Sequence, residues 1–247
     1  MRTFGLIGYP LGHSFSASYF SEKFSRENIL DASFKLFPLK SISEFPDLIR
    51  NNSLNGLSVT IPYKQSIISY LDEIDAEAET IGAVNCIKFV KISGKTKLIG
   101  YNTDIYGFET LLKKYVLSSQ EKALILGSGG GSKAIASVLR KIPIAFKFVS
   151  RTPYLIDSLH YNELTKEIIK KHRIIINTTP VGMFPDINKA PQIPYNFISE
   201  NHLCIDIIYN PLKTSFLIQS ELNRAKISNG IAMLYAQAER SWTIWNK

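Results

Sequence analysis

The 247-residue sequence is poor in cysteine and contains only Cys86 and Cys204. The two residues are far apart, and each lies inside an apolar run of the kind that forms a strand. Two isolated thiols provide neither a disulfide framework nor a zinc-binding set. We therefore expect two buried, reduced side chains and no metal site.

Long apolar runs are also missing. No segment approaches the roughly 20 apolar residues that cross a bilayer, and the N-terminus lacks a basic stretch followed by an apolar core. We find no repeat of fixed period. With 45% hydrophobic and 20% charged residues, the composition is that of a globular protein of one large or two modest domains, and we expect a cytoplasmic protein without a membrane partner.

Acidic residues are scarce in one part of the chain. Residues 1–104 hold 11 of the 29 Lys and Arg and 11 of the 21 Asp and Glu, so the net charge of +8 arises entirely from residues 105–247. Such an excess suits a polyanionic cofactor, although dispersed surface lysines also produce it. We find no zinc-finger spacing, basic helix or aromatic-basic RNA signature, so no nucleic-acid partner is expected.

Strands and helices alternate along the first part of the chain, which predicts a mainly parallel sheet in an α/β domain. The expected strands are 3–9, 34–37 and 55–60, followed by a pair at 82–90 and 97–101. The expected helices are 16–28, 41–50 and 75–80, and a further helix that starts at Pro62 and ends near Leu71.

A glycine-rich stretch, Leu124-Ile-Leu-Gly-Ser-Gly-Gly-Gly-Ser-Lys-Ala134, reads as a strand, a tight turn and a helix start. In such a unit Gly127 permits the turn, Gly129 lets the backbone approach a pyrophosphate, and the helix amides face that anion. Ser132 occupies the third glycine position of the dinucleotide fingerprint. A glycine-rich connection without a ligand is the alternative.

The glycine-rich stretch opens a second alternating series with strands at 145–150, 173–177 and 203–208, a loop at 188–201 and a helix at 229–246. We place the domain boundary at Asp104. The predicted domains are residues 1–104, onto which a C-terminal helix at about 229–247 packs back, and a Rossmann-type domain at residues 105–228.

Lys64 and Asp104 are candidates for proton transfer to a substrate oxygen. Lys64 falls near a predicted helix start, where a cation is disfavoured by the helix dipole, whereas Asp104 suits a helix N-cap. Two Tyr-x-x-x-Lys pairs, at 19–23 and 209–213, have the spacing of the proton-donor pair of short-chain dehydrogenases, in which both side chains share one helix face. They are poorer candidates. The first precedes the glycine-rich stretch, which is the wrong order, and the second contains Pro211, which does not suit a regular helix. His13 stays unassigned.

The cofactor's identity depends on the strand that ends in Ser150, Arg151 and Thr152. An NAD site would place Asp or Glu there to hold the ribose hydroxyls. A guanidinium with two hydroxyls instead suits a 2′-phosphate. We expect NADP, with an exposed arginine at a strand end as the alternative.

Eight stretches in order resemble motifs of the shikimate dehydrogenase family, and together they cover nearly the whole chain. They are residues 8–16 (Gly-Tyr-Pro-Leu-Gly-His-Ser-Phe-Ser), 59–64 (Val-Thr-Ile-Pro-Tyr-Lys), 82–85, 100–104 (Gly-Tyr-Asn-Thr-Asp), 150–152, 177–183, 206–214 and 229–237.

The resemblance implies reversible, NADPH-dependent reduction of 3-dehydroshikimate to shikimate, a step of aromatic amino-acid biosynthesis. It implies two domains with the active site in a cleft between them, and a catalytic pair formed by Lys64 and Asp104. It implies that these two residues also bind substrate, together with Ser14, Ser16, Thr60, Asn85, Tyr209 and Gln237. The cofactor would lie against Gly127, Ser128, Gly129, Gly130, Gly131, Ser150, Arg151, Thr152, Ile207 and Gly230.

Two departures from the family pattern bear on the cofactor. The family usually has Asn at the position of Ser150, and a second basic residue where this chain has Pro153, Tyr154 and Leu155. The preference for NADP is therefore expected to be weaker than is typical. Quinate as a second substrate, use of NAD and a catalytically silent nucleotide-binding protein stay open as alternatives, and either a monomer or a homodimer is compatible with the sequence.

Overall fold

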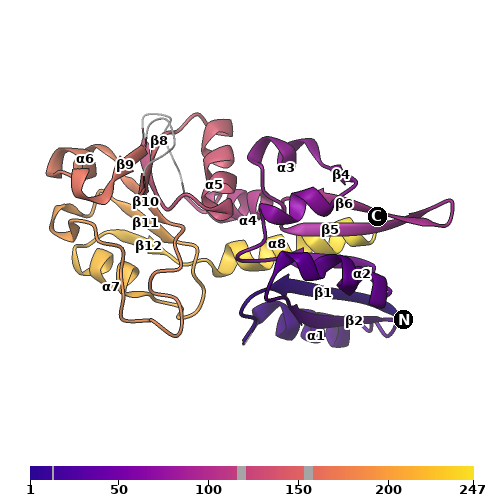
Figure 1. Ribbon diagram of the computed structural model, residues 1–247. Coiled ribbons are helices and arrows are strands. Elements are labelled where there is room, and N and C mark those ends of the chain that lie inside the picture. The colour runs from indigo at the N-terminus through magenta and orange to yellow at the C-terminus, as the bar shows by residue number, and fades with distance from the viewer. Residues whose placement is uncertain (13, 116–120, 153–157) are drawn as a thin grey trace. The chain divides into compact units, whose positions relative to one another are not determined.

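The computed structural model describes residues 1–12, 14–115, 121–152 and 158–247 and divides into two compact units (Figure 1). Unit 1 comprises Met1–Thr103 and Ala238–Lys247, and unit 2 comprises Asp104–Gln237. Unit 1 is thus built from two separate stretches of sequence. Within the described residues, no helix is both long and apolar enough to cross a membrane.

Unit 1 contains a six-stranded mixed sheet in the order β2-β1-β3-β5-β6-β4. Its strands are β1 (Arg2–Gly8), β2 (Ala32–Pro38), β3 (Gly56–Val59), β4 (Glu73–Ile74), β5 (Cys86–Ile92) and β6 (Lys95–Tyr101). β1 is parallel to both β2 and β3, and β4 is parallel to β6, whereas β5 runs antiparallel to β3 and β6. The carboxyl ends of β1 and β3 therefore lie at the same edge of the sheet.

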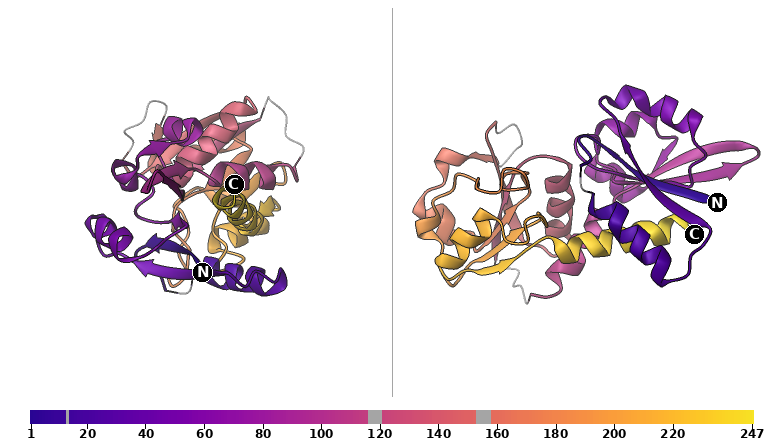
Figure 2. Two further views of the ribbon diagram at one scale, coloured as in Figure 1. Left: turned by 90° about the vertical axis from the view of Figure 1, so that its right-hand side faces the viewer. Right: turned by 90° about the horizontal axis from the view of Figure 1, so that it is seen from below.

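Helices cover both faces of this sheet. One face packs against α1 (Phe15–Arg26) and the second half of α8 (Ile231–Trp245), which run side by side in Figure 2. On this face the ring of Phe4 stacks on that of Trp245, with centroids 5.0 Å apart. The other face, with Ile7 and Val59, packs against α2 (Phe45–Asn51) and the 3-10 helix η2 (Ser66–Tyr70). Unit 1 consequently has two apolar layers, as an α/β sheet requires.

Unit 2 contains a second six-stranded sheet in the order β12-β11-β10-β7-β8-β9, and every pair of neighbours is parallel. Its strands are β7 (Lys122–Leu126), β8 (Ala145–Ser150), β9 (Ser158–His160), β10 (Ile174–Asn177), β11 (Leu203–Asp206) and β12 (Lys226–Ser228). The chain moves outward from β7 in one direction and then returns to β10 on its other side. In such doubly wound sheets, ligands bind beyond the carboxyl ends at this switch point.

Alternation along β7 divides the apolar side chains of unit 2 between two faces. Leu124 and Leu126 join a cluster with Ile169 and Phe216, whereas Ala123 and Ile125 point to the opposite face. The helices of unit 2 are α4 (Asp104–Leu112), α5 (Gly130–Lys141), α6 (Lys166–Lys171), α7 (Ser215–Leu222) and the first half of α8. This α/β architecture, with a mixed sheet in one unit and a Rossmann-type parallel sheet in the other, confirms the predicted fold class.

The predicted helix from Pro62 to Leu71 is wrong. Residues 61–65 form turns, and only the 3-10 helix η2 follows. The carbonyl of Lys64 accepts from the backbone N–H of Val84 at 2.7 Å, whereas the N–H of Ile68, its partner in an α-helix, donates to Gln65 at 3.2 Å. The short elements complete the chain: α3 (Ala76–Ile81), η1 (Ile42–Glu44), η3 (Tyr161–Glu163) and η4 (Tyr195–Phe197).

Candidate functional site

The edge of unit 1 where β1 and β3 end carries several of the predicted substrate residues. Ile7 pairs with Val59 in register, and the backbone N–H of Thr60 donates to the carbonyl of Ile7 at 2.9 Å. A methyl group on Gly8 would lie only 2.4 Å from Cγ2 of Thr60. Glycine at position 8 thus permits the two strand ends to approach each other closely.

Ser14 and Ser16 lie at the start of α1. Ser14 is the N-cap residue, but its side chain makes no capping hydrogen bond, and the first turn of the helix contains no acidic residue. Both serines are half-buried. Two hydroxyl groups at the start of a helix, where the helix dipole favours negative charge, are suited to an anionic group, and the predicted role of the two serines is to bind a carboxylate.

Asn85 is nearly fully buried and precedes β5. Its backbone carbonyl accepts from the N–H of Val59 at 2.8 Å, and its backbone N–H donates to Tyr101 at 3.0 Å. Its side-chain Oδ1 accepts from the backbone N–H of Thr103 at 2.6 Å and from the Thr103 hydroxyl at 3.2 Å. Asn85 therefore joins β3, β6 and the segment leading to Asp104.

Lys64 and Asp104 belong to different units. Lys64 is partly buried in the turn that follows β3, so the expected conflict with a helix dipole does not exist. Asp104 is 5% exposed and is the first residue of α4. An acidic side chain in the first turn of a helix is a favourable partner for the helix dipole.

The glycine-rich stretch forms the turn between β7 and α5. Gly127 has a φ of +107°, in the left-handed region, and a methyl group on it would lie 2.8 Å from Oγ1 of Thr178. A methyl group on Gly129 would meet no atom within 4 Å, and Gly129 is the N-cap of α5. Open space thus adjoins the helix N-terminus, as the binding of a pyrophosphate requires.

Ser132 explains how this turn tolerates the missing third glycine. Its side chain is buried, with 1% of its surface exposed, and its hydroxyl donates to the carbonyl of Gly129 at 2.6 Å. The Ser132 hydroxyl therefore stabilises the backbone of the turn. An apolar side chain at position 132 would leave the Gly129 carbonyl without this hydrogen bond.

Ser128 and Ser150 meet at the carboxyl ends of β7 and β8, with their hydroxyl oxygens 3.4 Å apart. The backbone N–H of Thr152 donates to the Ser150 hydroxyl at 3.3 Å. Arg151 is exposed, and its positive charge partly offsets the rise that burial causes in the pKa of Tyr161. Pro153, Tyr154, Leu155 and His13 lie outside the described residues.

Ile207 and Gly230 are in contact beyond the end of β11. A methyl group on Gly230 would lie 2.1 Å from the carbonyl oxygen of Ile207, and a methyl group on Gly131 would lie 3.4 Å from Cδ1 of Ile207. The structure thus brings together the predicted cofactor residues of three segments. Tyr209 and Gln237, predicted to bind substrate, are half-buried in the same unit, and Gln237 donates to the carbonyl of Leu234 at 3.0 Å.

Sequence reasoning assigned no role to Asp206, although the residue lies inside a motif that it singled out. The side chain is fully buried at the end of β11. Its carboxylate accepts from the Thr214 hydroxyl at 2.6 Å, the backbone N–H of Ile208 at 3.0 Å and the amide of Asn177 at 3.2 Å. Burial raises the pKa of this carboxyl to about 6, against the lowering effect of these hydrogen bonds.

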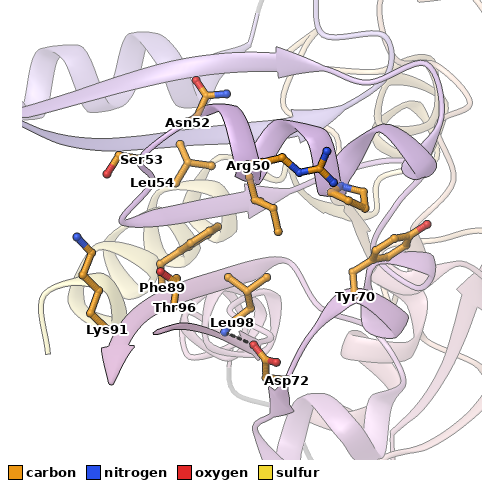
Figure 3. A pocket seen from close by; sticks show the side chains of 12 residues that line it. Arg50, Asn52, Ser53, Leu54, Tyr70, Asp72, Phe89, Lys91, Thr96 and Leu98 are labelled. Carbon is orange, nitrogen blue, oxygen red and sulfur yellow. Dashed lines mark hydrogen bonds between the residues drawn. The ribbon is translucent and has the colours of Figure 1, made fainter. Parts of the chain in front are cut away.

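A hollow of about 520 Å³ lies in unit 1 between α2 and the β5–β6 hairpin (Figure 3). Leu54, Phe89 and Leu98 form its apolar part, and Arg50 and Lys91 also line it. These residues precede β3 or belong to the far part of the hairpin, at the opposite end of β3 from Thr60. None of the lining residues is a predicted site residue.

No group of three or more His, Cys, Asp or Glu side chains in the described ranges is arranged to hold a metal ion. Cys86 and Cys204 are buried and free, as expected. Burial raises the pKa of each thiol to about 12. The thiols are therefore uncharged and inert near neutral pH.

Comparison with known proteins supports the reading of both units. Residues 6–87 match the family model described as the shikimate dehydrogenase substrate binding domain. The chain is 36% identical over 259 residues to a protein of Clostridium perfringens named shikimate dehydrogenase (NADP(+)), covering 100% of this chain and 93% of that protein.

Solved structures agree. A shikimate dehydrogenase of Peptoclostridium difficile superposes with a TM-score of 0.88 at 37% identity, covering 100% of this chain and 92% of its own. A shikimate 5-dehydrogenase of Thermus thermophilus in complex with NADP(H) and shikimate superposes with a TM-score of 0.85 at 27% identity, covering 99% of this chain and 93% of its own.

Proposed function

Because this chain belongs to the shikimate dehydrogenase family, we propose that Lys64 and Asp104 form the catalytic pair of its reaction. The chain is an NADP-dependent oxidoreductase that acts on a CH–OH group and interconverts shikimate and 3-dehydroshikimate, a step of aromatic amino-acid biosynthesis. The match of the whole chain is the observation that carries the proposal. The glycine turn, which leaves room for a pyrophosphate, supports NADP as the cofactor.

The residues of unit 2 fit NADP. The backbone amides at the start of α5 and the open space beside Gly129 suit the pyrophosphate, and the Arg151 guanidinium suits the 2′-phosphate. The cofactor supplies the hydride when it is bound. We propose that the remaining cofactor contacts come from the other residues predicted for it, which are Gly127, Ser128, Gly130, Gly131, Ser150, Thr152, Ile207 and Gly230.

The residues of unit 1 fit a hydroxylated carboxylate. The hydroxyls of Ser14 and Ser16 would bind the carboxylate at the start of α1. Thr60 and Asn85 would bind ring hydroxyls, with Tyr209 and Gln237 contributed by unit 2. This assignment makes residues 1–104 mainly the substrate domain and residues 105–228 the cofactor domain. Residues 238–247 belong to the same compact unit as residues 1–103.

The catalytic step needs a proton at the oxygen that gains negative charge as the carbonyl is reduced. We assign the donor to the Lys64 ammonium, and a role in orienting Lys64 and binding a substrate hydroxyl to Asp104. A positioned acid of this kind contributes roughly 10²- to 10⁴-fold to a rate. In the reverse direction the lysine amine accepts the proton from the substrate hydroxyl.

The test is absorbance at the nicotinamide band, with shikimate or quinate as substrate and NADP or NAD as cofactor. Rapid shikimate-dependent reduction of NADP is expected. Equal rates with NAD would contradict the role of Arg151 but not the substrate assignment, whereas no turnover with any pair would favour a catalytically silent nucleotide-binding protein. Light scattering on the same sample tests the proposal of a monomer or homodimer.

A further inference from the structure

We infer that Asp206 is a positioning residue for the reaction, because its buried carboxylate fixes the segment that carries Ile207 and Tyr209. The inference rests on the proposed function, in which these two residues contact cofactor and substrate. Asp206 itself is fully buried at the end of β11, so its side chain offers no surface to a cofactor or a substrate. Its effect must therefore pass through the groups that donate hydrogen bonds to it.

The first of these groups is the backbone N–H of Ile208, which donates to Oδ1 of Asp206 at 3.0 Å. The carbonyl of Ile208 in turn accepts from the N–H of Gly230 at 3.0 Å, and the N–H of Ile207 donates to the carbonyl of Asn177 at 3.1 Å. Ile207 is thus held by its own N–H and by the hydrogen bonds of the neighbouring Ile208. The position of Ile207 determines where its own side chain meets the cofactor. It also determines where Tyr209, two residues further along the chain, lies.

The second group is the hydroxyl of Thr214, which donates to Oδ2 of Asp206 at 2.6 Å. Thr214 is the N-cap of α7 and is fully buried. The carboxylate therefore holds both ends of the segment from Ile207 to Thr214: one end through Ile208 and the other through Thr214. Tyr209 lies between these two anchors.

The third group is the amide of Asn177, whose nitrogen donates to both carboxylate oxygens at 3.2 Å. The side-chain oxygen of Asn177 accepts from the N–H of Thr179 at 3.1 Å and from its hydroxyl at 2.7 Å. Thr178 lies against Gly127, and its hydroxyl donates to the carbonyl of Leu126 at 2.6 Å. The cluster thus extends from Asp206 to the glycine turn.

Burying the Asp206 carboxylate costs hydration free energy, which favours a role in positioning over a role in stabilising the fold. All three of its partners are uncharged, and desolvation raises its pKa. An ionised group in such surroundings contributes little net stability, because its hydrogen bonds must first offset the loss of hydration. What the arrangement does provide is a fixed geometry at three segments, and displacements of about 1 Å can lower rates by roughly 10²-fold.

The test compares Asp206→Asn and Thr214→Val with the control Thr165→Val. Thr165 and Thr214 are both N-caps whose hydroxyls accept from a helix N–H at 3.4 Å, but only Thr214 bonds to Asp206. Turnover, KM for each substrate, equilibrium binding of NADP and urea unfolding are measured for each variant. The two cluster variants should lose about ten-fold or more in kcat/KM for NADP, whereas Thr165→Val should stay within about two-fold.

Wild-type kinetics and NADP affinity in both cluster variants would overturn the inference. So would losses that match the fraction unfolded, or that Thr165→Val reproduces at equal stability. If Asp206→Asn does not fold, the comparison of Thr214→Val with Thr165→Val decides. If the wild-type enzyme itself does not oxidise shikimate, the proposed function fails, while NADP binding by the variants still tests Asp206.

Discussion

The side-chain Oδ1 of Asn85 accepts two hydrogen bonds from Thr103, one from its backbone N–H at 2.6 Å and one from its hydroxyl at 3.2 Å. These bonds fix the orientation of the carboxamide, since an acceptor must face Thr103. The amide nitrogen is then the group that we propose donates to a substrate hydroxyl.

Asn85→Asp should keep the acceptors for Thr103 but lose the N–H₂ donor. We expect KM for shikimate to rise about ten-fold or more in the folded protein, and the free energy of unfolding to fall by roughly 1–3 kcal/mol because the new carboxylate is buried. The control is Asn52→Asp, which removes a donor to the carbonyl of Leu48 at the hollow of Figure 3. An unchanged KM in Asn85→Asp would remove Asn85 from the substrate site.

Lys64→Ala should lower turnover by roughly 10²- to 10⁴-fold, because the proton donor is lost. Cooperative unfolding should persist, since Lys64 lies in a turn between β3 and η2. Lys40→Ala, at an exposed position of the same unit, serves as the control. Turnover of Lys64→Ala near that of the control would refute the catalytic assignment.

Arg151→Ala should weaken NADP binding by about ten-fold or more and leave NAD binding nearly unchanged, because only NADP carries the 2′-phosphate. Titration calorimetry with the two cofactors measures the ratio directly. Arg173→Ala removes an exposed arginine of the same unit and should leave the ratio at its wild-type value. A parallel loss of affinity for both cofactors would place Arg151 elsewhere on the cofactor.

Gly129→Ala should weaken NADP binding and leave the stability of the protein nearly unchanged. The new methyl group meets no protein atom within 4 Å, so the free energy of unfolding should stay within about 1 kcal/mol of wild type. The methyl would occupy space that the pyrophosphate needs, so NADP affinity should fall. Gly230→Ala provides the contrast, because its methyl would lie 2.1 Å from the Ile207 carbonyl oxygen and should lower stability as well. Wild-type NADP affinity in Gly129→Ala would contradict the binding site.

Asp206 should make stability depend on pH. Its pKa is about 6 in the folded protein against an ordinary value of 3.8, so the folded state binds the proton more tightly than the unfolded state. Stability should therefore rise as pH falls from about 7 to about 4, by up to about 3 kcal/mol from this group. Tyr195 and Cys204, the titratable neighbours, have pKa values raised by burial and stay neutral in this range.

The comparison of wild type with Asp206→Asn isolates this contribution. The difference between their free energies of unfolding, measured in urea from pH 7 to pH 4, should shift in favour of the wild type toward low pH. A difference that is constant with pH, or that shifts in the opposite direction, would show that the carboxyl has an ordinary pKa.

The sequence predicted the elements whose apolar pattern is long enough to read. β8 spans residues 145–150 as expected, and β1 and α1 differ from the predicted ranges by one or two residues, which is the usual uncertainty of element ends. β9 and β12 are three residues long, too short for alternation to be recognised. At the helix expected from Pro62, the chain forms turns instead, and the carbonyl of Lys64 accepts from the distant Val84 and not from Ile68.

The site could be predicted only in part. Motifs placed Asn85 and Asp206 in segments of interest, but spacing gives no information on the hydrogen bonds that orient them. The link from Asp206 to Asn177 joins residues that are 29 positions apart, and the link from Asn85 to Thr103 joins residues 18 positions apart. Such pairs are created by strand order in the sheets, which local sequence patterns do not determine.

Unit 1 is built from the two ends of the sequence, and this has a consequence for the order in which the protein folds during synthesis. Residues 1–103 leave the ribosome first, yet one apolar layer of their sheet is completed only by Trp242, Ile244 and Trp245. All of unit 2 is synthesised in between. The N-terminal part of unit 1 therefore acquires its full core only after unit 2 has been synthesised, and a premature stop after Gln237 would leave one face of its sheet partly uncovered.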